Sequence, residues 1–138
     1  ITDNRLHLCH VFTVDDLKYL HRGGRVSKTA AIAGSILGIK PLLHVDNEGH
    51  LIPVGKIRGR KQSIEKLVDM MCERMGNWDN STVAVCHGDC LSDAEYAADL
   101  MRKKLGKKTT VHICYTGAVI GSHSGPGTLA LFFMGDQR

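Results

Sequence analysis

The sequence predicts a single α+β domain in which a mixed, mostly antiparallel sheet has helices packed on one of its faces. Three observations support this. The chain has 138 residues, the length of one domain. Its apolar fraction of 43% is near the globular average, and a domain of this length buries roughly two-thirds of its unfolded surface. Expected strands alternate with expected helices only in the second half, which favours a mixed sheet over a doubly wound parallel one.

The start of the chain is expected to be helical. Acidic residues and two leucines on one face follow Thr13, so a helix over 13–20 with Thr13 as its N-cap is predicted. A second helix is expected over 28–37, with Ser27 as its N-cap. Its residues are small and apolar almost all round, as in helices that are buried or that line an apolar cavity.

A hairpin and a long amphipathic helix come next. Residues 41–45 read as a strand, 46–49 as a turn and 50–58 as the returning strand. Residues 61–75 carry apolar side chains at helical spacing, which predicts a helix.

The rest of the chain alternates between strands and other elements. Strands are expected over 82–86, 109–115 and 129–134. A helix is expected over 93–104 with Ser92 as its N-cap. Residues 117–127 are rich in glycine and are expected to form a loop.

Composition narrows the class of protein. The five cysteines are odd in number and form no Cys-x-x-Cys pair, which indicates reduced cysteines in the cytoplasm. No run of about 18 apolar residues predicts a membrane span, and the first residues lack the apolar segment of a signal peptide. Because the chain begins with Ile1, we interpret it as a domain trimmed from a longer protein. The net charge of +4 gathers in basic clusters that attract anions.

Three motifs match known sites only in part. Residues 121–125 resemble a nucleophile elbow, but histidine occupies the third position, where that motif needs serine. Residues 125–130 carry the letters of a dinucleotide fingerprint but lead into a strand. Cys86, His87 and Cys90 are three candidate metal ligands, too few for the paired knuckles of a zinc site, so no metal site is predicted.

Two segments remain as candidate anion sites. Residues 117–128 surround His123 with glycines and hydroxyl side chains, and such a loop offers many N–H and O–H donors. His123 can also add a proton near neutral pH. Residues 56–61 place several basic side chains where a strand leads into a helix N-terminus, a position suited to a phosphate or carboxylate.

Five short segments stand out when the chain is taken as a whole. They are GGRVSK at 23–28, GIKPLL at 38–43, KIRGRK at 56–61, HGD at 87–89 and GSHSGPG at 121–127. In this order they resemble the carboxyl-terminal domain of the DegV family, and the resemblance covers nearly the whole chain.

The resemblance implies a function. Residues 1–138 would be a lipid-binding carboxyl-terminal domain, with an amino-terminal α/β domain outside this chain. A long-chain fatty acid would lie between the two domains as the ligand, with no cofactor and no metal. Family members are similar to the lipid-presenting subunit of bacterial fatty acid kinases, in which a separate ATP-binding partner phosphorylates the acyl carboxylate in the cytoplasm.

The resemblance also implies roles for individual residues. His123, with Gly121 and Ser122, would lie near the carboxylate, and Arg58 would lie close to the head group or the partner surface. The acyl tunnel would be lined by Ala30, Ala33, Ile36, Leu37 and Ile120.

Two other classes of function stay open at this point. One is a standalone acyl-handling hydrolase or transferase that uses His123 with Asp89 or Ser122, and turnover without a partner would reveal it. The other is a nucleic-acid-binding module built on the basic clusters. One Trp, three Tyr and three Phe are few for a protein that stacks bases, and a salt titration of nucleic-acid affinity would test it.

Overall fold

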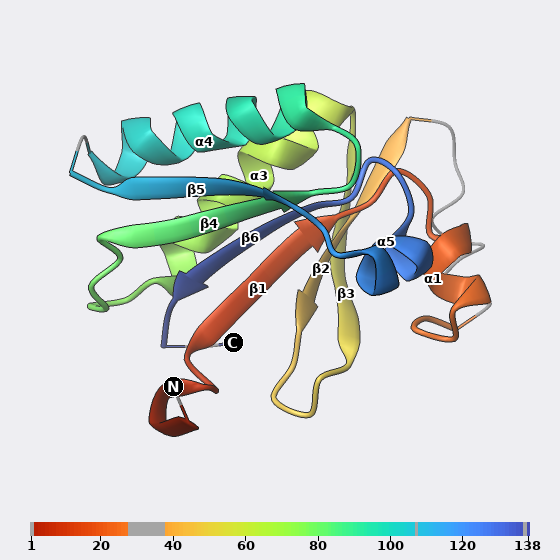
Figure 1. Cartoon of the computed structure of the whole chain (residues 1–138), viewed down its shortest axis with the longest axis horizontal. Helices are drawn as coiled ribbons and strands as arrows, with labels where there is room; N and C mark the ends of the chain where they lie inside the picture. Colours follow the sequence, from red (N-terminus) through yellow and green to blue (C-terminus); the bar gives the residue numbers. More distant parts are fainter. Residues whose placement is uncertain (1, 28–37, 107, 137) are drawn as a thin grey trace.

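The chain forms one six-stranded sheet, with strand order β3-β2-β1-β6-β4-β5, in the computed structural model (Figure 1). The structure describes residues 2–27, 38–106, 108–136 and 138. The strands are β1 (Leu8–Thr13), β2 (Ile39–Val45), β3 (Leu51–Arg58), β4 (Thr82–His87), β5 (Thr110–Tyr115) and β6 (Leu129–Met134). The helices of the described part are η1 (Thr2–Asn4), α1 (Lys18–Arg22), α3 (Arg60–Arg74), α4 (Leu91–Leu105) and α5 (Ala118–Ser124). Only β4 and β5 pair in parallel in this sheet, so the predicted mixed, mostly antiparallel sheet is confirmed.

The two long helices α3 and α4 cover one face of the sheet. Successive side chains of a strand point to opposite faces, so Val11 of β1 joins this core while Phe12 points the other way. Leu67 of α3 and Met101 of α4 are fully buried against the strands. This layer is the main hydrophobic core of the described part of the chain.

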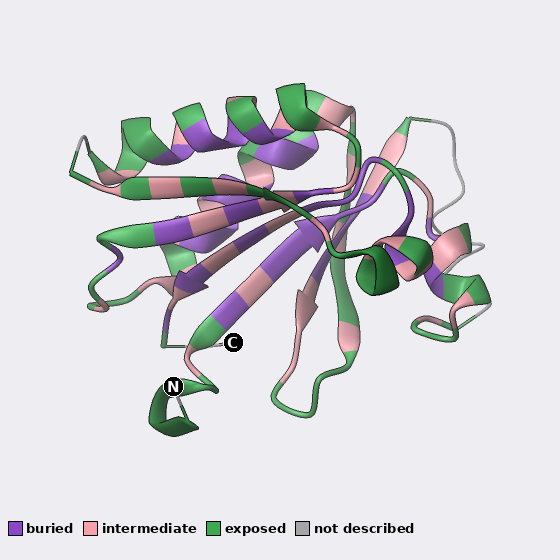
Figure 2. Cartoon of the chain, in the orientation of Figure 1, coloured by how far each residue is buried: buried purple, intermediate pink, exposed green. Residues whose placement is uncertain are grey.

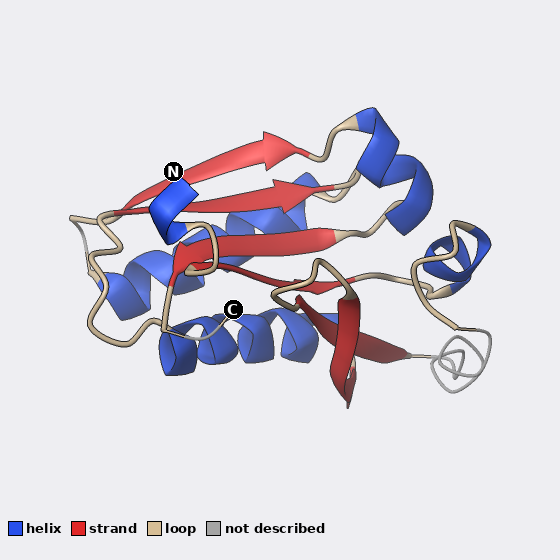
Figure 3. Ribbon diagram, turned by 90° about the horizontal axis from the view of Figure 1, so that it is seen from below, coloured by secondary structure: helices blue, strands red, loops and turns tan. Residues whose placement is uncertain are grey.

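The opposite face carries a smaller cluster and the two short helices. Phe12 and Leu43 pack there against Leu17 and Leu20, from the start of α1. Helices α1 and α5 contact each other and lie together at one end of the sheet (Figures 1 and 3). The prediction of helices on one face therefore holds for α3 and α4, while α1 and α5 lie over the other face.

The first predicted helix is wrong in its position. Thr13 caps no helix; it is the last residue of β1, fully buried and paired with Leu42 and Leu129 of the neighbouring strands. Helix α1 begins at Lys18, whose backbone N–H donates to the Asp16 carboxylate at 2.8 Å. Pairing on both sides at the centre of a sheet outweighs the local capping preference of a threonine.

The glycine-rich segment is also not the loop that was predicted. Residues 118–124 form α5, between Gly117 and Gly125. Ser92 is not an N-cap either, because α4 begins at Leu91 and its N-cap position is Cys90.

The hairpin, α3, β4, the body of α4, β5 and β6 are confirmed to within a few residues. The helix expected over 28–37 lies outside the described residues. None of the described helices is long and apolar enough to cross a membrane.

Candidate functional site

An apolar cavity of about 430 Å³ lies on the face of the sheet that α3 and α4 leave uncovered. Its floor includes Phe12 of β1 with Ala130 and Phe132 of β6, and α5 contributes Val119 and Ile120 to its wall. Val45, Leu51 and Leu20 complete the apolar part of the lining. The volume falls within the roughly 300–1,000 Å³ of small-molecule sites, and the mostly apolar lining suits an apolar ligand.

The rim of this cavity leaves large apolar side chains in contact with solvent. Tyr115, Val119 and Ile120 are 71%, 75% and 65% exposed, and all three line the cavity. Figure 2 shows α5 largely exposed beside the buried centre of the sheet. Exposed apolar groups that gather at one place mark a surface made for a ligand or for another protein domain.

Helix α5 holds His123 at the cavity through two close approaches to α1. A Cβ atom on Gly23 would overlap the imidazole of His123, so only glycine leaves room for this ring. One residue past the helix, Gly125 has a φ of 81° and lies against the ring of Tyr19. A side chain there would be strained by the backbone and would collide with the tyrosine. These glycines fix the position of α5 rather than loosen it.

The expected donor-rich loop does not exist as such, because α5 uses its donors internally. The N–H groups of Gly121 and Gly125 donate to carbonyl oxygens four residues earlier, each at 2.8 Å. The Ser122 hydroxyl donates to the Val119 carbonyl at 2.7 Å, and the Ser124 hydroxyl donates to that of Ile120 at 2.9 Å. His123 thus becomes the main polar group that α5 itself offers to the cavity.

Arg25 places a cationic side chain on the same cavity as His123, and it was missing from the predicted site residues. It lies just after α1, is exposed, and donates from its guanidinium to the carbonyl oxygen of Gly23. Gly23 is also the residue that His123 packs against. Arg25 and His123 therefore both contact Gly23, and both line the cavity. The GGR segment singled out in the sequence contains this pair, but its sequence does not reveal that it faces a histidine about a hundred positions later.

The predicted site residues divide into three groups. Ile120 and His123 line the cavity. Gly121, Ser122 and Arg58 are absent from its lining. The four tunnel residues expected on the helix over 28–37 lie outside the described residues: Ala30, Ala33, Ile36 and Leu37.

Arg58 ends β3 at a separate place, where it is exposed and pairs in the sheet with Ile39. Its neighbour Arg60 is engaged in structure: its guanidinium contacts Asp93 at 2.8 Å and Asp15 at 3.7 Å. Within the basic stretch, Arg58 is therefore exposed, whereas Arg60 links α3 to α4 through its ion pair with Asp93.

The three residues weighed as metal ligands do not converge. Cys86 lines the cavity on the open face, whereas Cys90 packs against the core on the other face. His87 is buried, and its Nδ1 accepts the N–H of Cys90 at 3.3 Å.

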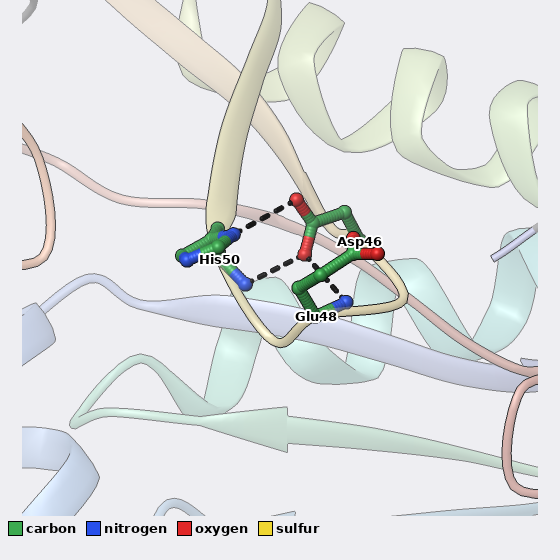
Figure 4. Close-up of side chains that lie close together, drawn as sticks. All are labelled: Asp46, Glu48 and His50. Carbon is green, nitrogen blue, oxygen red and sulfur yellow. Dashed lines mark hydrogen bonds and ion pairs between the residues drawn. The ribbon is translucent and has the colours of Figure 1, made fainter.

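Another group of possible ligands lies in the β2–β3 turn (Figure 4). There the Asp46 carboxylate accepts the backbone N–H groups of Glu48 and His50 at 3.0 and 2.7 Å and contacts the His50 ring at 3.2 Å. These contacts are those of a carboxylate that closes a hairpin turn.

Fold and cavity together define a class: an α+β domain whose sheet is covered on one face and open on the other, with an apolar ligand cavity on the open face. The chain belongs to the DegV family. The family model, described as uncharacterised protein, DegV family, matches residues 1–136.

The comparisons with individual proteins agree with this membership. A DegV domain-containing protein of Clostridium perfringens is 46% identical over 138 residues, which cover 100% of this chain and 47% of that protein. The crystal structure of DegV, a fatty acid binding protein from Bacillus subtilis, is 33% identical with a TM-score of 0.74, covering 98% of this chain and 47% of that one. The Streptococcus pneumoniae fatty acid kinase (Fak) B3 protein, loaded with linoleic acid, shares the fold at 17% identity and a TM-score of 0.86, covering 98% of this chain and 47% of that one. The chain thus spans about half the length of these proteins.

Proposed function

We propose that this chain forms one wall of a long-chain fatty-acid site in a two-domain protein and presents the fatty acid to an ATP-dependent kinase subunit. The observation that carries the proposal is the apolar cavity with His123 and Arg25 among its lining residues. Residues 1–138 would be the carboxyl-terminal domain, and an amino-terminal domain would close the site. The related Bacillus subtilis protein is a fatty acid binding protein, which supports the same ligand class here.

The acyl chain would lie against the sheet and α5. Each methylene group that leaves water for such a surface contributes about 0.8 kcal/mol, so an acyl chain gains most of its affinity from the wall itself. The floor residues Phe12 and Phe132 belong to paired strands of the sheet, and Ile120 lines the same cavity from α5. A preformed apolar surface of this kind binds without the entropic cost of ordering its side chains.

The carboxylate would lie at the His123 end. A hydrogen bond to a charged group is worth about 1.5–3 kcal/mol, and the imidazole of His123 can donate one. Arg25 would add positive charge at the same rim.

Arg58, which is exposed and outside the cavity lining, would serve docking of the kinase, as would Ser122 and Gly121 on the outer side of α5. The reaction with an ATP-using partner would take place in the cytoplasm.

Replacing Ile120 tests the proposed wall. Full-length protein carrying Ile120→Glu should lose most of its bound fatty acid, because the new carboxylate would bring an unpaired charge into the apolar acyl site. Ala118→Glu is the matched control: Ala118 is exposed on the same helix but is not part of the cavity lining. Native mass spectrometry of the purified proteins measures the occupancy. Equal occupancy in the two variants would place the acyl chain elsewhere.

Arg58→Ala tests whether presentation of the fatty acid to the kinase can be lost while the fatty acid stays bound. Fatty-acid occupancy should be retained while kinase-dependent phosphorylation falls, whereas His123→Ala should lower phosphorylation through the head group itself. Arg102→Ala, an exposed arginine on α4, is the control. Turnover of an acyl substrate by the purified protein without kinase and ATP would support the enzyme hypothesis instead.

A further inference from the structure

Cys86 and Cys114 lie opposite each other on the neighbouring strands β4 and β5. They are direct partners in the register of this parallel pair, and their two Sγ atoms are 2.7 Å apart. Adjacent strands of a sheet are about 4.8 Å apart, and a disulfide spans Cα separations of about 4.4–6.8 Å. The two sulfurs therefore lie where a covalent bond needs little movement of the backbone.

This pair is set apart from the other cysteines. Cys9, Cys72 and Cys90 belong to the core beneath α3 and α4, or pack against it. Cys86 lines the cavity on the open face, and Cys114 is exposed beside it on the edge strand β5 (Figure 1). Reagents dissolved in water thus reach Cys114 first and find Cys86 directly behind it.

The environments of the two thiols suit different roles. Burial, then a hydrogen bond and charge coupling to Cys114, raises the pKa of Cys86 to about 12. The Cys114 sulfur also approaches the Val85 carbonyl at 3.5 Å, which holds it over β4. Cys114 is exposed and is suited to react first, and the half-buried Cys86 is suited to follow.

We propose that Cys86 and Cys114 form a reversible disulfide site on the ligand-binding face of the sheet. With hydrogen peroxide as oxidant, the Cys114 thiol first gives up its proton. The thiolate sulfur then attacks one peroxide oxygen, the O–O bond breaks, and the sulfur keeps that oxygen as a sulfenic acid. The other oxygen leaves as hydroxide and takes up the proton that the thiol released, which makes the first water. The Cys86 sulfur then attacks the sulfenic sulfur; the S–S bond forms, and the hydroxyl leaves with the Cys86 proton as a second water. The peroxide takes up the two electrons that the thiols lose. A dithiol reductant restores both thiols by disulfide exchange.

Ligand and disulfide should also influence each other, a point that rests on the proposed function. Because Cys86 lines the cavity, a fatty acid in that cavity covers its sulfur and hinders the second step. Occupied protein should therefore oxidise more slowly than empty protein. At a free ligand concentration about ten times the Kd, the rate should fall by up to roughly tenfold, in proportion to the remaining empty fraction.

Peptide mapping of the full-length protein tests the disulfide. Reduced protein is treated with hydrogen peroxide, alkylated with iodoacetamide and digested. Mass spectrometry should find the Cys86 and Cys114 peptides joined, at a mass lower by two hydrogen atoms than their sum, and dithiothreitol should separate them. Closing this loop in the unfolded chain should also raise the Tm by about 5–10 °C.

Variants and ligand loading complete the test. Cys114→Ser should abolish the cross-link, and Cys72→Ser should keep it. Recovery of both cysteines as separate alkylated or sulfinic peptides after peroxide would overturn the proposal.

Oxidation is repeated with oleic acid bound, with binding confirmed by native mass spectrometry. An unchanged rate on loaded protein would refute the coupling to the ligand, whereas failure of oleic acid to bind would count against the proposed function and leave the cross-link result standing.

Discussion

The two faces of the sheet differ in how completely helices cover them. Of the residues that the structure describes, sixteen buried apolar or cysteine side chains form the core under α3 and α4, but only five form the cluster on the other face. Two long helices seal the first face, while the second keeps a cavity of about 430 Å³ and leaves Val119 and Ile120 exposed. One face therefore buries most of the hydrophobic core, and the other leaves apolar surface exposed around a cavity.

The largest expected effect is loss of stability from the covered face. Leu67→Ala removes a fully buried side chain from α3 and should lower the free energy of unfolding by about 2–5 kcal/mol, since a cavity is left in a tightly packed layer. Urea unfolding of the full-length protein measures it. Phe132→Ala, on the open face, should lower the free energy of unfolding less than Leu67→Ala does. It should lower the fatty-acid occupancy more. If Phe132→Ala proved as destabilising as Leu67→Ala and left fatty-acid occupancy intact, the division between the two faces would be wrong.

A smaller effect should come from the glycine that positions α5. Gly125→Ala should destabilise by about 1–3 kcal/mol, because Gly125 has a φ of 81° and its Cα faces the Tyr19 ring. Gly121→Ala is the control: nothing lies within 4 Å of an added Cβ there, and alanine favours the helix. Thermal unfolding of both variants distinguishes them. Equal Tm values would mean that the α1–α5 contact does not fix the helix.

The smallest expected effect is a pH dependence from the floor of the cavity. Burial, and then the charge of Arg138, lower the pKa of His10 below its usual 6.5, so the folded state binds its proton less readily than the unfolded state does. Stability is therefore full above pH 6.5 and is lost as the pH falls through that value towards the folded pKa. His10→Phe should reduce this loss, as followed by urea unfolding between pH 7 and 5. A wild-type stability that rises on acidification would contradict the sign.

Much of the covered face could be predicted from the sequence. Helix α3 is indicated by apolar residues at helical spacing, and strand β6 by a short continuous apolar run. Strand β1 was missed because His10 interrupts its apolar pattern and acidic residues follow Thr13. Its central place between β2 and β6 comes from pairing with distant strands, which no local pattern contains.

The candidate site was harder to predict than the fold. His123 and Ile120 could be selected from the segment around them, although that segment proved to be a helix rather than a loop. Arg25 and Cys86 could not, because each reaches the cavity through contacts between segments far apart in the chain. Arg58 was chosen with the same basic stretch as Arg60, and only the structure separates an exposed side chain from one bound to Asp93.

The central claim is that the open face of the sheet binds an acyl chain, and photolabelling tests it most directly. A long-chain fatty acid with a diazirine on its acyl chain is bound to the full-length protein and irradiated, and the labelled peptides are identified by mass spectrometry. The account predicts label on β1, β6 and α5, at or beside Phe12, Phe132 and Ile120, and competition by unlabelled fatty acid. Label confined to α3 and α4, or absent from this chain while the fatty acid is bound, would contradict it.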